Sequence, residues 1–167
     1  MAMDAEHREF FWKVHEYTNE YIRFADAKAG VGIVFCGAML SVLYSNGLHK
    51  PLLTTPVVAW HLRDAVAAAA FVLLALGALA AACSIRPRLP NSQPKGFIFW
   101  ESVRAHPDGE SFADAAASEG MDALGRHLAV HLHIIAGIAS RKYWWAQASI
   151  LVTIAGAVCA AAAILLT

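Results

Sequence analysis

The chain of 167 residues is long enough for one ordinary domain, but 58% of its residues are hydrophobic and only 16% are charged. Soluble domains average about 45–50% apolar and about 25% charged residues, so the composition excludes a typical soluble enzyme and a disordered chain. Thirteen basic and thirteen acidic side chains cancel, which argues against a nucleic acid polymer as the partner. Three cysteines are too few for a disulfide framework, and none of them has the C-x-x-C spacing of a zinc or redox site.

Three long apolar runs explain the hydrophobic excess. Residues 29–48, 65–85 and 143–167 contain no charged side chain. Since a helix rises ~1.5 Å per residue, each run can cross a hydrocarbon core ~30 Å thick. The alternative, three helices buried in a soluble core, would need an outer shell that a chain this short lacks. We predict an all-α integral membrane protein with transmembrane helices at 29–48, 65–85 and 143–166.

The segment before the first run, residues 1–28, carries six acidic and four basic side chains. A cleaved secretory leader has a short basic start instead, so we expect the first span to be retained. Apolar residues recur in this segment at helical spacing, which predicts an amphipathic cytosolic helix with a packing face. No proline separates it from the span, so the two are expected to form one helix. The stripe comprises Phe10, Phe11, Val14, Tyr17, Tyr21, Ile22 and Ala25.

The polar connections differ in length and composition. Residues 49–64 are predicted to form a short external loop, and residues 86–142 a small cytosolic helical module. The module begins with a linker, because three prolines in residues 86–96 cannot continue the second span. Ser111 resembles an N-cap in a capping box with Asp114, which would open a short alanine-rich helix. Residues 121–142 show a second helical stripe that is expected to continue into the third span.

The distribution of basic residues predicts the topology. Residues 1–28 and 86–142 together hold eleven of the thirteen Lys and Arg side chains. The positive-inside rule therefore places both segments in the cytoplasm, with the N-terminus inside and the C-terminus outside. Trp60 and the aromatic run Tyr143–Trp145 lie where an aromatic belt is expected. We predict a multi-pass membrane protein.

Charged residues cluster at the predicted inner membrane surface. Snorkelling and topological anchoring are sufficient reasons for the arginines after the second span. Asp26 needs a cation, and Arg141 or Lys142 from the third helix is the expected partner. Arg23, three residues before Asp26, is a local alternative. The cluster comprises Asp26, Lys28, Arg86, Arg88, Arg141 and Lys142.

Small residues at four-residue spacing occur in all three runs, and such stripes let helices approach closely. We therefore expect a homo-oligomer, although an alanine-rich sequence also produces these stripes by chance. The stripes comprise Gly37 and Ser41, Gly77 and Ala81, and Ser149, Thr153, Ala157 and Ala161.

The sequence shows no catalytic arrangement. His127 and His131 share a helix face, as two zinc ligands could, but no further ligand stands at suitable spacing, so packed or solvated histidines are the preferred interpretation. No nucleophile elbow, phosphate-binding loop or dinucleotide fingerprint is present. We predict that the chain is not an enzyme and has no catalytic residue, metal or cofactor.

Several segments together resemble a known family. Tyr21–Ala29, which leads into an apolar span, resembles the FAD-x-KA motif of the Pycsar transmembrane effectors. Further similar segments follow in the same order and in the same places relative to the three spans, and the resemblance covers nearly the whole chain from about residue 15. These segments are Arg86–Leu89, Ile98–Ser102, Ser111–Phe112, His131–Ile135 and Ile138–Tyr143.

The resemblance implies a role in antiphage defence at the bacterial inner membrane, with the N-terminus in the cytoplasm and the C-terminus in the periplasm. In such systems a companion cyclase makes cyclic UMP or cyclic CMP during infection, the effector responds by impairing the membrane, and the cell dies before phage mature. This chain shows no recognisable cyclic-nucleotide-binding barrel, so sensing would lie in the helical module. The positions that the motif match carries over are Asp26, Lys28, His133, Lys142 and Tyr143.

These expectations lead to a hypothesis for ligand binding. Cations would hold the phosphate of the cyclic nucleotide, and aromatic side chains would stack on its base. The alternative function is a non-enzymatic membrane anchor or adaptor whose cytosolic helices dock a partner protein. The candidate cations are Arg23, Lys28, Lys95, Arg141 and Lys142, and the candidate aromatic residues are Phe97, Phe99 and Trp100.

Overall fold

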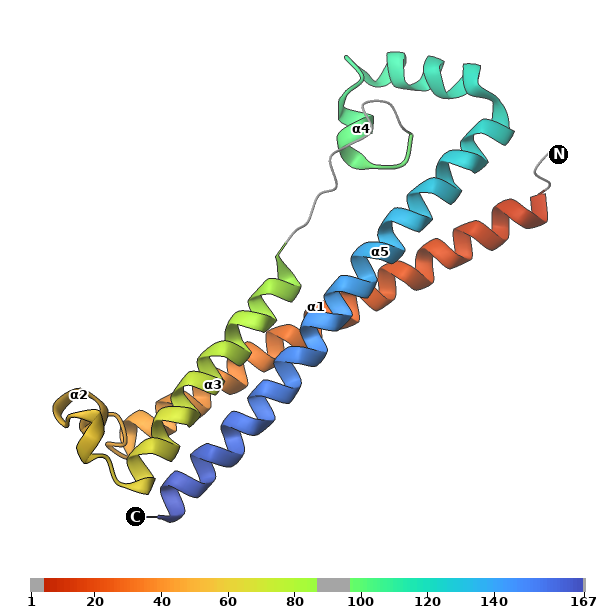
Figure 1. The fold of residues 1–167 in the computed structure, drawn as a ribbon. Helices are drawn as coiled ribbons and strands as arrows, with labels where there is room; N and C mark the ends of the chain where they lie inside the picture. Colours follow the sequence, from red (N-terminus) through yellow and green to blue (C-terminus); the bar gives the residue numbers. More distant parts are fainter. Residues whose placement is uncertain (1–4, 87–96, 167) are drawn as a thin grey trace. The chain divides into compact units, whose positions relative to one another are not determined.

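A computed structural model describes residues 5–86 and 97–166, which form helices and no strand (Figure 1). Three helices, α1, α3 and α5, are long and apolar enough to cross a membrane. The predicted all-α fold with three spanning helices is therefore confirmed. In chain order the elements are α1 (Ala5–Ser45), α2 (Lys50–Thr54), the 3-10 helix η1 (Val57–Ala59), α3 (Leu62–Ile85), α4 (Trp100–Arg104) and α5 (Gly109–Leu165).

The chain divides into two compact units, which are described separately below. The first, which we call the module, comprises Met1–Arg23 and Pro87–Ser140. The second, which we call the membrane bundle, comprises Phe24–Arg86 and Arg141–Thr167. Helices α1 and α5 each contribute residues to both units, because the units divide within these two helices.

Helix α1 is continuous from the predicted amphipathic segment into the first apolar run, as the lack of proline predicts. It ends at Ser45, three residues before the end of the predicted span. Gly47 adopts a positive φ of 74°, and the backbone N–H of Leu48 donates to the carbonyl of Leu43 at 3.2 Å. This is the glycine-dependent helix end known as a Schellman motif, which satisfies carbonyls that the helix leaves without partners.

Helix α3 begins at Leu62, three residues before the predicted span. The Asp64 carboxylate accepts a hydrogen bond from the backbone N–H of His61 at 3.1 Å and caps the first turn. The helix ends where Arg86 takes an extended ψ of 124°. Proline is the next residue in the sequence, and a proline disfavours the helical conformation of the residue before it.

Helix α5 begins at Gly109, and Asp108 rather than the predicted Ser111 caps it. The Asp108 carboxylate accepts a hydrogen bond from the backbone N–H of Ser111 at 2.7 Å, so Ser111 already lies in the first turn. Gly120, with φ 76° and ψ 159°, interrupts the helix. A short alanine-rich helix therefore precedes a long one, and the long helix runs without a break from Met121 through the third apolar run, as predicted.

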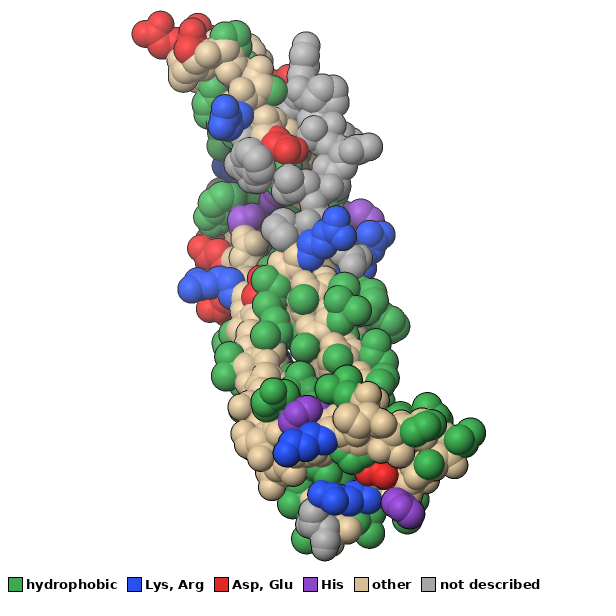
Figure 2. Space-filling view, turned by 90° about the vertical axis from the view of Figure 1, so that its left-hand side faces the viewer, with side chains coloured by type: hydrophobic (Ala, Val, Ile, Leu, Met, Phe, Trp, Pro, Cys, Tyr) green, Lys and Arg blue, Asp and Glu red, His purple; other side chains and the backbone are tan. Residues whose placement is uncertain are grey.

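The core of the membrane bundle consists mainly of small and medium side chains from α1, α3 and α5. The face drawn in Figure 2 shows hydrophobic side chains over the middle of the bundle, with basic and histidine side chains gathered at the connection between α1 and α3. A lipid environment adds little hydrophobic driving force between helices, so close packing must hold them together. The core residues are Cys36, Leu43, Leu48, Ala67, Ala70, Leu74, Ala160 and Ala163.

Gly77 on α3 allows a close approach between α3 and α5. A Cβ at this position would overlap the Thr153 hydroxyl and would lie 3.4 Å from the Thr153 backbone nitrogen and Cα. Gly156 plays a similar role, because its Cβ would lie 3.0–3.1 Å from the side chains of Leu73 and Leu74. Gly37 has nothing within 4 Å of such a Cβ. The small residues of α3 and α5 thus serve packing within the chain, whereas Gly37 on α1 faces outward.

Candidate functional site

An ion pair joins α1 to α5 within the membrane bundle. The Lys142 ammonium nitrogen lies 2.5 Å from Oδ1 of the Asp26 carboxylate. The Lys142 side chain is only 11% exposed, and the Asp26 side chain is 37% exposed. Of the two predicted partners from the third helix, Lys142 meets Asp26, whereas Arg141 is exposed. The pair is charge-assisted and partly shielded from water, which strengthens it relative to a surface pair.

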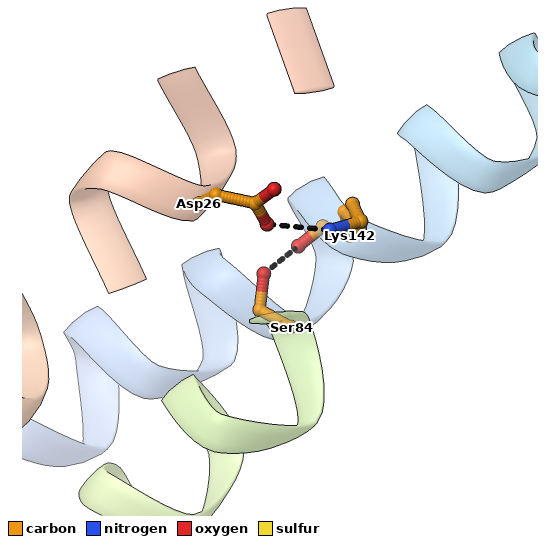
Figure 3. Close-up of polar contacts among 3 residues, drawn as sticks. All are labelled: Asp26, Ser84 and Lys142. Atoms are coloured by element: carbon orange, nitrogen blue, oxygen red, sulfur yellow. Dashed lines mark hydrogen bonds and ion pairs between the residues drawn. The ribbon is translucent and has the colours of Figure 1, made fainter. Parts of the chain in front are cut away.

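Ser84 of α3 brings the third helix to the same level. Its hydroxyl donates to the backbone carbonyl of Lys142 at 3.1 Å, and the side chain is fully buried. Figure 3 shows Asp26 and Ser84 approaching the same residue of α5, one from α1 and the other from α3. The ion pair and this hydrogen bond therefore connect all three long helices at one residue. We call Asp26, Ser84 and Lys142 the junction.

Lys28 lies one half-turn beyond Asp26 on α1. Its ammonium nitrogen is 5.6 Å from the centre of the Tyr143 ring, which is a cation–π contact between α1 and α5. Lys28 is exposed, and no ion pair of Lys28 is found among the described residues. The bundle therefore presents one shielded ammonium in the junction and one exposed ammonium beside it.

Buried hydroxyl groups connect the helices further along the bundle. The Ser149 hydroxyl donates to the carbonyl of Gly77 at 2.8 Å, which joins α5 to α3. Cys36 Sγ and Thr153 Oγ1 lie 3.2 Å apart, which joins α1 to α5. These contacts, together with the junction, show that α1 and α5 run in the same direction through the bundle. They also give each buried hydroxyl a partner, which an apolar environment requires.

The remaining predicted site residues lie elsewhere in the chain. Arg23 is exposed on α1 and belongs to the module, and His133 is exposed on α5 in the module. Trp100 is the first residue of α4. Lys95 falls outside the described residues, as does Arg88 of the predicted charged cluster.

The module contains two groups of histidine and aromatic rings in tilted or edge-to-face contact. In the first, His131 contacts His15 at 5.4 Å and Phe99 at 6.2 Å between ring centres. In the second, Phe97 lies 5.4 Å from the ring of His127 and 6.0 Å from that of His106. The predicted shared face of His127 and His131 is therefore occupied by phenylalanine rings.

Burial lowers the pKa of His131, and the nearby His15 lowers it further. The neutral imidazole is thus the form that the packed module favours. Within residues 5–86 and 97–166, no three His, Cys, Asp or Glu side chains gather in a way that could hold a metal ion. His127 and His131 pack against the rings of Phe97 and Phe99 respectively.

Sequence reasoning missed Ser84, because a serine near the end of an alanine-rich helix has no special pattern. The carbonyl that Ser84 contacts belongs to a helix 58 residues away in the chain. Ser149 and Thr153 were recognised only as small residues. Their four-residue spacing is the available signal, and their hydroxyls could have been assigned to hydrogen bonds between helices on that basis.

The fold and the junction define a class: a multi-pass α-helical membrane protein in which a charged pair joins two spanning helices where they leave their apolar runs. Comparison with known proteins narrows this class. The profile of the Pycsar effector protein domain matches residues 10–167. The chain belongs to the Pycsar effector family, which supports a role as an effector in antiphage defence.

Two curated relatives match most of the chain. The Pycsar effector protein PtPycTM of Propioniciclava tarda is 32% identical over 155 residues, which cover 89% of this chain and 74% of the relative. The Pycsar effector protein SaPycTM of Staphylococcus aureus is 31% identical over 138 residues, which cover 81% of each protein. No solved structure matches the chain significantly. The predicted family is thereby confirmed.

Proposed function

We propose that this chain is a non-enzymatic effector that responds to cyclic UMP or cyclic CMP from a companion cyclase. In response it impairs the bacterial inner membrane, and the infected cell dies before phage mature. The module lies in the cytoplasm with the N-terminus, and the C-terminus lies in the periplasm. The excess of Lys and Arg in residues 1–28 and 86–142 supports this orientation.

The junction is the observation that carries the proposal. The Asp26 carboxylate holds the Lys142 ammonium group, and a phosphate is a strong competitor for an ammonium group. In the proposed mechanism, the phosphate of the nucleotide competes with Asp26 for Lys142, and the exposed Arg141 assists. Loss of the ion pair then frees α1 to move relative to α5 within the bundle, because the ligand binds the separated state better than the joined state.

Recognition of the base by aromatic residues is a separate prediction. Phe97 and Phe99 already contact histidine rings in the module. A base that stacks on either of them would share the ring with a histidine or replace it. Stacking on Trp100 remains a prediction without a structural argument.

Self-association is a further part of the proposal. Gly37 and Ser41 lie exposed on α1 at four-residue spacing. This spacing lets a helix from a second copy approach closely. A homo-oligomer assembled through this face would bring several bundles together, so that a movement of α1 acts on the bilayer at many points.

The proposal is tested by membrane depolarisation in bacteria. The full chain is expressed with a membrane-potential dye, and an inducible cyclase supplies either cyclic UMP or cyclic CMP. The wild type is expected to depolarise the membrane with one nucleotide and not without it. Lys142→Met should abolish this dependence on the nucleotide. Lys13→Met serves as the control, because Lys13 is exposed and forms an ion pair with Glu9 one turn away on the same helix.

Two outcomes would overturn the proposal. If Lys142→Met and Lys13→Met respond to the nucleotide like the wild type, the junction has no part in sensing. If the wild type is present in the membrane but responds to neither nucleotide, the adaptor function is favoured instead. The exposed aromatic side chains Phe10, Tyr17 and Tyr21 on α1 are the feature that such a partner would bind.

A further inference from the structure

A groove runs along the surface of the membrane bundle between α1 and α5. Its volume is about 480 Å³, and its walls are almost entirely apolar. The residues of α1 that line it extend from Ala27 to Phe35, so the groove is ~12 Å long at the helical rise per residue. This length is close to the depth of one bilayer leaflet, which is half of a ~30 Å hydrocarbon core. The lining residues are Ala27, Lys28, Val31, Gly32, Phe35, Ser149, Ile150, Thr153 and Ile154.

The floor of the groove offers no free polar group to a ligand. Ser149 and Thr153 are buried there, and their hydroxyls are engaged with Gly77 and Cys36 respectively. Gly32 keeps the floor low, because it has no side chain to cover Ser149. A Cβ at this position would lie 3.6 Å from the Ser149 hydroxyl oxygen. A polar ligand would gain nothing in such a groove, whereas a hydrocarbon chain fits it.

Lys28 is the one charged residue among those that line the groove, and it lies at the end nearest Asp26. It is exposed, and its recorded contact is with the face of the Tyr143 ring, which leaves the ammonium hydrogens available to an anion. A positive charge at the end of an apolar groove of leaflet depth complements a molecule with an anionic head and an acyl tail. A helix from a second copy would instead bring another apolar surface and leave Lys28 without a counter-ion.

We propose that the groove between α1 and α5 binds an anionic phospholipid, with an acyl chain in the groove and the headgroup phosphate at Lys28. Snorkelling alone explains a lysine at a membrane edge but does not explain an apolar groove that begins at that lysine. The lipid covers Val31 and Phe35 and stands beside the two helices that the junction joins. The anionic lipid content of the membrane therefore contributes to the packing of α1 against α5.

The test uses the purified full chain without any cyclic nucleotide, so that its failure is independent of the proposed function. Native mass spectrometry in detergent compares retention of phosphatidylglycerol and phosphatidylcholine at equal concentrations. One lysine contributes about 1 kcal/mol to the attraction of anionic lipid, so about fivefold greater retention of phosphatidylglycerol is expected. Lys28→Gln should remove the preference, Lys28→Arg should keep it, and Lys50→Gln, which removes an exposed charge elsewhere in the bundle, should not change it.

The apolar part of the site is tested with a matched pair of variants. Val31→Trp fills the groove and should reduce the retention of both lipids. Val34→Trp places the same side chain on the same helix outside the groove, and the two valines are similarly exposed, at 71% and 73%. Val34→Trp should therefore leave retention unchanged. Circular dichroism establishes that each variant is folded.

Three results would overturn the proposal. Equal retention of the two lipids by the wild type would exclude selection of an anionic headgroup. Equal lipid loss in Val31→Trp and Val34→Trp would exclude the groove as the site. A dimer that Val31→Trp dissociates, with lipid retention unchanged, would assign the groove to a second copy of the chain.

Discussion

Removing either partner of the junction ion pair should have unequal effects on stability. Asp26→Ala leaves the Lys142 ammonium without the Asp26 carboxylate in a position where the Lys142 side chain is only 11% exposed. Lys142→Met leaves the Asp26 carboxylate, whose side chain is 37% exposed and can be hydrated. The charge that is left in the drier place costs more, so Asp26→Ala should be the more destabilising change.

The expected loss of stability in each variant follows from the exposed fractions of the Asp26 and Lys142 side chains. Removing one partner of a fully buried pair costs about 3–5 kcal/mol, and the partial exposure of Asp26 reduces the expected cost of Asp26→Ala to about 2–3 kcal/mol. Lys142→Met should cost about 1 kcal/mol, because the remaining carboxylate stays partly solvated. The double variant removes both charges and should cost little more than Lys142→Met alone. The coupling free energy is then about 2 kcal/mol.

The assay is equilibrium unfolding of the purified protein in mixed micelles with increasing denaturing detergent. All four members of the double-mutant cycle are compared. The same cycle at the exposed pair of Glu9 and Lys13 on α1, where both side chains are about two-thirds exposed, serves as the control and should show far weaker coupling. Equal destabilisation by the two single changes, or additive effects in the double variant, would refute the reasoning from burial.

Three further predictions concern helix packing, pH and capping. Gly77→Leu should destabilise the bundle by about 1–3 kcal/mol because α5 leaves no room for the side chain, whereas Gly37→Leu, with open space around it, should change unfolding little. The lowered pKa of His131 means that the unfolded chain binds the proton more readily, so the module should lose stability as pH falls below about 6.5. Amide hydrogen exchange near His131, corrected for intrinsic rates, should then be faster at pH 5.5 than at pH 7.5, and His131→Phe should remove this difference. Asp108→Ala should cost about 1 kcal/mol by removing the cap of α5, which thermal unfolding measures, and Asp108→Asn should retain most of the stability.

Features that depend on neighbours in the sequence were predictable. The apolar runs, the absence of proline in α1 and the proline after Arg86 specify where helices persist and where one ends. Boundaries were less accurate. Gly47 ended α1 three residues early through its positive φ, and Asp64 began α3 three residues early by capping it. Both devices act at a single residue, and hydrophobic periodicity does not detect them.

The junction was only partly predictable. An acid at a membrane edge needs a cation, so the sequence narrowed the partners of Asp26 to adjacent residues of the third helix and one local arginine. The choice between Arg141 and Lys142 depends on which side chain faces α1, and adjacent residues on a helix point in directions about 100° apart. The rotation of α5 about its own axis decides this, and contacts such as that of Ser149 with Gly77 set that rotation.

By itself, the sequence determined that this protein is helical, that three of its segments can cross a membrane, and that it resembles the Pycsar effectors. Composition, local propensity and residue order carry those properties, and none of them requires knowledge of which helices touch. The tertiary structure decided which lysine meets Asp26, that Ser84 joins the same residue, and that an apolar groove begins at Lys28. Those features arise between residues more than 50 positions apart, and only the packing of small side chains between helices brings them together.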